Sequence, residues 1–276
     1  MSKKKRILIL IKSYLLVLSY DLIFAFILGI ISFAASFLGY DYELTMDRYY
    51  LIWDSLGCLI LLIIYYYILK KHVVIPRIRG DYSLLKTFII TLGSCGISFI
   101  WLYLLSIVAL NTPIIGQMYE DFGETWSNLL SGEYLWIFIS VVLLGPLVEE
   151  VLFRGILINV LNTGFSRKTS IIIAAFLFGI WHKDPVQMVY TTIFGIFLGM
   201  VYSRINDLRY PIGMHILNNS INSLPEGNFS EMAFNIIMMI CLLFVIPSIA
   251  LTFRRKKGEL SLEDYDKYWD NINNVN

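Results

Sequence analysis

The chain has 276 residues, of which 57% belong to the apolar set AVILMFWYC and only 16% are charged, and its formal net charge is +1. Soluble domains are closer to half apolar and a quarter charged, so this composition excludes an ordinary soluble domain. The small net charge gives no electrostatic reason to expect a nucleic-acid partner. The apolar residues come in blocks that can form helices of roughly 20 residues, enough to cross a bilayer. We therefore predict an all-α, polytopic membrane protein whose partner is the lipid bilayer.

Eight membrane-spanning helices are predicted from the apolar runs and the breakers between them. They cover residues 7–38, 50–70, 84–110, 134–162, 169–183, 186–204, 210–224 and 233–253. Several of these runs are shorter than a full crossing, which predicts tilted or broken helices near the middle of the bundle. The first run follows basic residues, as in a signal peptide, but it is too long and has no small-residue cleavage site, so we expect a retained span.

Basic residues cluster before the first span and after the second, fourth, sixth and eighth, whereas the other loops are acidic or nearly neutral. The acidic loops include the stretch with Glu120, Asp121 and Glu124. The positive-inside rule then places both termini in the cytosol, and an even number of spans requires the same. We read residues 1–276 as a single multi-pass domain of the cell membrane. Its polar cytosolic tail, residues 255–276, is either a short surface helix or disordered.

Three charged residues, Glu149, Glu150 and Arg154, interrupt the apolar stretch LLGPLVEEVLFRG. At 1.5 Å per residue, the two carboxylates lie roughly 20 Å from the cytosolic end of their helix, where ionisable residues suggest function. Arg154 follows Glu150 by one helical turn, so we expect these two to pair and Glu149 to stay unpaired. An unpaired carboxylate in apolar surroundings holds a proton more readily than in water, which suits a general base. The same residues would also suit a structural ion pair.

Two of the three histidines fall in predicted spans. His182 ends AAFLFGIWH at a depth similar to that of Glu149, and His215 lies in PIGMHILNNSIN with Asn219 one turn deeper. A single buried histidine is more often a hydrogen-bonded core residue. Three helices that carry polar groups to neighbouring depths are harder to explain by packing. The spacing lets Phe178 pack on His182, and it lets His215 and Asn219 point two donors at one space, which suits a developing oxyanion.

Two further carboxylates lie in predicted spans. Asp54 is near the outer end of its span, and we expect its side chain to reach the interface. Asp21 lies deeper, and the sequence suggests no partner for it.

The segments EEVLFR, FGIWH and HILNN, at residues 149–154, 178–182 and 215–219, have the order and spacing of the motifs EExxxR, FxxxH and HxxxN. These motifs are typical of the CAAX-protease and bacteriocin-processing (Abi) family of intramembrane endopeptidases. The chain resembles that family over roughly residues 134–224, the predicted catalytic core.

This resemblance implies an eight-span bundle around a cavity. It implies that Glu149 and His182 activate a water, that His215 and Asn219 stabilise the oxyanion, and that Glu150 and Arg154 form a supporting pair. The implied substrate is a peptide or a lipid-anchored protein, and the reaction is expected to need no cofactor and no metal.

Three alternatives remain open. Glu149, His182 and His215 could be three ligands of a catalytic zinc, although no HExxH pair is present. The protein could be a non-enzymatic one that confers immunity to a bacteriocin, or a transporter, since buried carboxylates mark ion paths. The complete set of motifs favours the endopeptidase. The sequence carries no signal of an oligomeric state.

Overall fold

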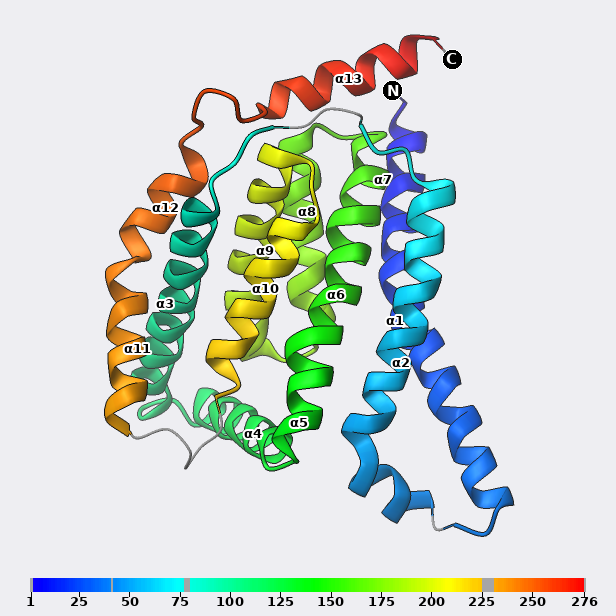
Figure 1. Cartoon of the computed structure of the whole chain (residues 1–276), viewed down its shortest axis with the longest axis vertical. Coiled ribbons are helices and arrows are strands. Elements are labelled where there is room, and N and C mark those ends of the chain that lie inside the picture. The colour runs from blue at the N-terminus through cyan, green and yellow to red at the C-terminus, as the bar shows by residue number, and fades with distance from the viewer. Residues whose placement is uncertain (1, 41, 77–79, 225–230, 276) are drawn as a thin grey trace.

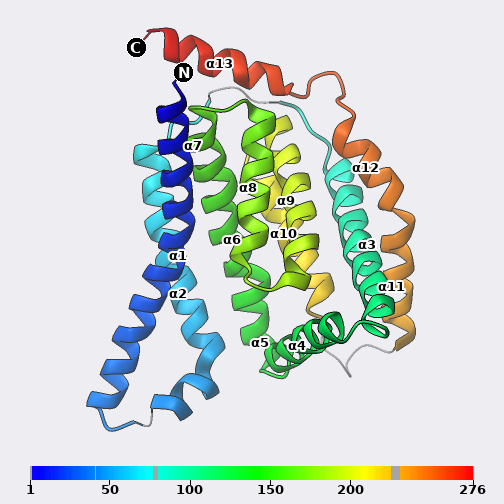
Figure 2. The ribbon, with the colours of Figure 1, turned by 180° about the vertical axis from the view of Figure 1, so that it is seen from behind.

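The computed structural model describes residues 2–40, 42–76, 80–224 and 231–275, and this part of the chain is helical without a strand. Helices α8, α9 and α10 occupy the middle of an upright bundle, α1 and α2 flank one side, and α3, α11 and α12 flank the other (Figure 1). Both views place the two termini at the same end (Figure 2). This fits the prediction that they share one side of the membrane; that the side is the cytosol remains a prediction.

The helices follow the predicted runs closely. Their bounds are α1 (Lys3–Phe37), α2 (Tyr42–His72), α3 (Leu84–Ala109), α4 (Pro113–Leu130), α5 (Tyr134–Ile137), η1 (Phe138–Leu144), α6 (Gly145–Glu150), η2 (Val151–Leu157), α7 (Ile158–Asn162), α8 (Arg167–Trp181), α9 (Pro185–Ile205), α10 (Arg209–Asn222), α11 (Glu231–Leu243), α12 (Val245–Phe253) and α13 (Leu262–Val275). The all-α class is confirmed.

Within the described residues, six helices are long and apolar enough to cross a membrane, so the chain is a multi-pass membrane protein. The predicted spans 169–183 and 210–224 are helices α8 and α10, of 15 and 14 residues. At 1.5 Å per residue each is about 22 Å long or less, short of the ~30 Å hydrocarbon core. These two helices are as short as the sequence indicates, while their tilt in the membrane and the total of eight spans stay predictions.

The predicted span 134–162 is continuous but not uniformly α-helical. Two π-helical segments, η1 and η2, flank the six residues of α6. Glu149 and Glu150 are the last two residues of α6. Pro146 contributes to the irregularity, because it has no N–H to donate to the preceding turn. Such π segments are frequent at functional sites.

Helix α4 was not expected. The sequence predicts an acidic loop there, but residues Pro113–Leu130 form an 18-residue amphipathic helix that lies across the end of the bundle away from the termini (Figure 1). Phe122 and Trp126 line a cavity on its inner face, while Glu120 and Glu124 are exposed. Between the acidic residues, apolar residues recur with the period of a helix and form one apolar face. A search for long apolar runs does not detect such an amphipathic helix.

The C-terminal tail is a surface helix, α13, so the helical alternative is confirmed over most of residues 255–276. It lies across the end of the bundle that carries the termini (Figure 1). Its anchor is the fully buried Arg167, whose guanidinium carbon lies 4.0 Å from the centre of the Tyr265 ring. The backbone N–H of Arg167 donates to Asp266 at 2.7 Å. Burial raises the pKa of Tyr265, so this ring stays neutral beside the cation.

We predict that Tyr265→Ala destabilises the protein by about 3 kcal/mol, because it removes a large buried ring and the cation–π contact. Tyr265→Phe is the matched control: the Tyr265 hydroxyl has no hydrogen-bond partner among the described residues, so its loss should cost little. Thermal unfolding of the two variants in detergent checks this, and equal melting temperatures would contradict the anchoring role.

Candidate functional site

A cavity of about 590 Å³ lies inside the bundle, and four of the six predicted site residues line it: Glu149, His182, His215 and Asn219. These residues come from α6, from the end of α8 and from α10. The other two, Glu150 and Arg154, do not line the cavity and are almost completely buried, with 0% and 2% of their side chains exposed. The structure thus brings all three motifs together and separates the two adjacent glutamates.

Glu150 and Arg154 form the predicted ion pair, with Arg154 Nη1 2.7 Å from Glu150 Oε1. Arg154 Nη2 also donates to the carbonyl of Gly195 at 3.4 Å. The guanidinium carbon lies 4.6 Å from the centre of the Phe178 ring, within cation–π range. The guanidinium therefore contacts Glu150 on its own helical run, Phe178 on α8 and Gly195 on α9. A buried charge requires such compensating contacts.

His215 lies between the two carboxylates. Its Nδ1 is 2.8 Å from Glu150 Oε1, and its Nε2 is 3.7 Å from Glu149 Oε2. Since a carboxylate only accepts, Nδ1–H donates to Glu150. Nε2 then carries a proton only in the imidazolium form, and in that form it is directed at Glu149. The ring is held edge-on by Phe178 and Phe194, with centroids 5.9 and 5.3 Å away.

His182 has a fixed tautomer. Its Nδ1 is 2.7 Å from the carbonyl oxygen of Phe178, which can only accept, so Nδ1 carries the proton and Nε2 keeps its lone pair. The Phe178 ring meets the imidazole edge-on at 4.7 Å, as the FxxxH spacing predicts. The next residue, Lys183, has a left-handed φ of 60°, which ends α8 and turns the chain into α9.

Asn219 is oriented by an irregularity of the neighbouring helix. Its Nδ2 donates to the carbonyl of Val141 at 2.8 Å. Val141 lies in η1, where a carbonyl bonds the N–H five residues later, but that residue is Pro146, which has no N–H. The freed carbonyl holds the Asn219 amide, whose NH₂ group has a second N–H to offer.

Glu149 is the carboxylate that Arg154 does not pair with, and its charged neighbour is Nε2 of His215, at 3.7 Å. Its Oε2 is buried and has no hydrogen-bond partner among the described residues, and 12% of the side chain is exposed. The predicted pairing of Arg154 with Glu150 is confirmed, whereas Glu149, which was expected to stay unpaired, lies within 3.7 Å of His215.

Two carboxylates that sequence reasoning did not assign also line this cavity. The expectation that Asp54 reaches the interface is wrong: it accepts a short hydrogen bond from Ser140 of η1 and a longer one, at 3.9 Å, from Cys58. Asp21, for which no partner was evident, pairs with Lys183 at 2.9 Å. The contact of Asp54 with Ser140 and that of Asp21 with Lys183 join segments far apart in the sequence, so no local pattern could have found them.

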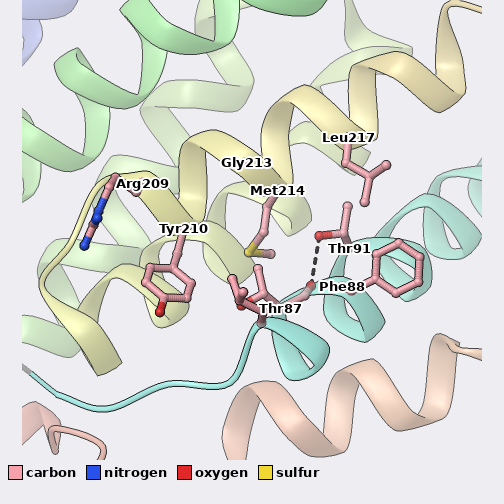
Figure 3. Close-up of a pocket in the computed structure, with 9 residues that line it drawn as sticks. Thr87, Phe88, Thr91, Arg209, Tyr210, Gly213, Met214 and Leu217 are labelled. Atoms are coloured by element: carbon pink, nitrogen blue, oxygen red, sulfur yellow. Dashed lines mark hydrogen bonds between the residues drawn. The ribbon is translucent and has the colours of Figure 1, made fainter.

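A second cavity, of about 420 Å³, lies between α3 and α10 (Figure 3). Its walls are Thr87, Phe88 and Thr91 on one helix and Tyr210, Met214 and Leu217 on the other. None of the six predicted site residues lines it, so the motifs belong to the larger cavity alone.

Fold and site thus define a multi-pass helical membrane protein with buried acidic and imidazole side chains around a cavity. Residues 131–221, which include all six predicted site residues, match the family model described as type II CAAX prenyl endopeptidase Rce1-like. The resemblance inferred from the three motifs is confirmed over this segment.

The chain is also 26% identical over 137 residues to a Bacillus subtilis (strain 168) protein named "Putative membrane peptidase YdiL". That similarity covers 46% of this chain and 56% of the relative, so it extends over about half of each protein. No solved structure shows a significant match.

We predict that Glu150→Ala destabilises the fold by roughly 3–5 kcal/mol, because it leaves the Arg154 guanidinium buried without its partner. Arg154→Ala should have a similar effect, and the double variant should lose less than the sum of the two, since neither charge is then left alone. Melting temperatures of the three variants in detergent measure this. A fully stable Glu150→Ala protein would contradict the supporting role.

Proposed function

We propose that the protein is a glutamate-dependent intramembrane endopeptidase that hydrolyses peptide bonds of a membrane-associated or peptide substrate. The observation that carries the proposal is the position of Glu149: a carboxylate with no hydrogen-bond partner at Oε2 among the described residues lines a cavity together with His182, His215 and Asn219, while its neighbour Glu150 is held by Arg154. A structural ion pair would need only the second arrangement.

In the proposed reaction, a water in the cavity lies between Glu149 and the Nε2 lone pair of His182. Glu149 takes a proton as the water oxygen bonds to the carbonyl carbon of the substrate. The negative charge that develops on the carbonyl oxygen is stabilised by Nε2–H of an imidazolium at His215 and by the second N–H of Asn219. The C–N bond then breaks, and the proton held by Glu149 passes to the leaving amine.

Glu150 acts behind this site. It accepts from Nδ1 of His215 and so orients the ring, which directs Nε2 towards the cavity side of Glu149. Arg154 compensates the same carboxylate from its own helix. A peptidase activity, though not these individual roles, is supported by the match to the CAAX endopeptidase family model and by the name of the Bacillus subtilis relative.

The zinc alternative has less support. Within the described residues no three His, Cys, Asp or Glu side chains converge as a metal-ligand group. The immunity and transport alternatives would not require the paired donors of His215 and Asn219.

We predict that Glu149→Gln lowers the rate of proteolysis by about 10²–10⁴-fold, as expected for the loss of a general base, and leaves the protein folded. The side chain keeps its size and loses only its basicity. Comparative peptidomics of membranes that contain either protein identifies substrates, and purified protein then gives the rate. Glu133→Gln, an exposed site outside the cavity, is the matched control. Substantial activity of purified Glu149→Gln protein would rule out this assignment.

Strong chelators should leave the activity unchanged, and the purified protein should contain no stoichiometric zinc. Elemental analysis and activity after dialysis against a chelator test both points. One equivalent of zinc, with activity restored only by added metal, would favour the metallopeptidase instead.

A further inference from the structure

The cavity contains a second carboxylate that the proposed chemistry does not use. Asp54 lies on α2, and both of its hydrogen bonds, from Ser140 and Cys58, reach Oδ2 and come from neutral groups. Oδ1 has no partner among the described residues, and no described cation pairs with this side chain. A carboxylate in such a position is costly unless something compensates it.

The other charges of the cavity do not compensate Asp54. Its charged lining residues are three carboxylates, Asp21, Asp54 and Glu149, and one ammonium, Lys183. Lys183 is already paired with Asp21. Even with the imidazolium at His215 that the proposed reaction uses, the cavity has three negative and two positive charges, and Asp54 is the carboxylate that neither cation pairs with.

The surroundings of Asp54 suit an organic cation. Tyr50 precedes Asp54 by one helical turn and also lines the cavity, as does Tyr20, whose hydroxyl contacts Cys58 at 3.6 Å. Aromatic rings beside a carboxylate accept the flat face of a guanidinium or the methylenes of a lysine. Residues 87–153 contain no Lys or Arg, and α4, which lies in that segment, exposes Glu120 and Glu124.

The separation of Asp54 and Glu149 determines how many residues of a bound peptide lie between the group that Asp54 contacts and the bond that is cut. Ser140, which bonds Asp54, precedes Glu149 by nine residues on the continuous helical run. At the α-helical rise of 1.5 Å per residue this is about 13 Å at most, because the residues up to Leu144 are π-helical and rise less. An extended peptide advances about 3.3 Å per residue, so four residues cover this distance.

We propose that Asp54 is a specificity-determining residue that binds a basic side chain, lysine or arginine, about three to four residues from the scissile bond of the peptide substrate. The inference rests on the proposed function for the position of the cut, but the recognition of a cation by Asp54 can be measured without cleavage.

The test uses the full chain in detergent and a set of 12-residue peptides in which one lysine is moved through an otherwise neutral sequence, with glutamine at the same positions as the reference. Binding is measured on the Glu149→Gln protein, and cleavage is measured on the unchanged protein by mass spectrometry. We expect lysine at one spacing to improve both binding and kcat/KM by about 10-fold or more, as for a charge-assisted hydrogen bond.

Asp54→Asn should abolish the preference, so that lysine and glutamine peptides bind equally well, and Asp54→Lys should prefer glutamate at the same spacing. Glu120→Gln, which removes a negative charge at the same end of the bundle but outside the cavity, should keep the preference. Equal treatment of lysine and glutamine peptides by a protein that cleaves both would overturn the inference and leave the proposed function intact. A lysine preference in binding that requires Asp54, without any cleavage, would support the inference and overturn the proposed function.

Discussion

The arrangement of the site depends on how the buried charge of the Glu150 carboxylate is paired. Glu150 is completely buried, and it is held from its own helix by Arg154 and from α10 by His215. An apolar environment allows such a charge only when it is paired and hydrogen-bonded, so these contacts fix α10 against the run 134–162. Because Arg154 and the Nδ1 of His215 are thereby occupied, the adjacent Glu149 is left to face the cavity. Glu149 thus faces the cavity while the partners nearest to it are bound to Glu150.

Two of the three central helices, α8 and α10, are short, and this leaves room for the cavity. The α8 helix ends at Trp181 and the α10 helix at Asn222, after about 22 Å or less, so neither fills the ~30 Å of a hydrocarbon core. Helix α4 lies across that end of the bundle, and Phe122 and Trp126 supply part of the cavity wall. Polar side chains placed at the ends of short helices thus meet in a common space instead of facing lipid.

Sequence reasoning found the features that are local along the chain. The pairing of Glu150 with Arg154 follows from one helical turn, and the apolar runs give most helix bounds within a few residues. It could not find that Asp54 meets Ser140, since 86 residues separate them and the contact depends on how α2 packs on η1. It also missed α4, because a criterion based on apolar length overlooks an amphipathic helix that lies across a bundle.

The two π-helical segments have a consequence for sequence comparison. A π turn holds one residue more than an α turn, so η1 and η2 each correspond to an inserted residue in an otherwise regular helix. A relative that lacks one of these extra residues would have the downstream side chains rotated by about 100° around the axis. Conservation of chain length between Phe138 and Leu157 is therefore as informative about a shared site as conservation of the glutamates. An alignment gap in this segment would distinguish proteins that share only the residues of the motif from proteins that also share its geometry.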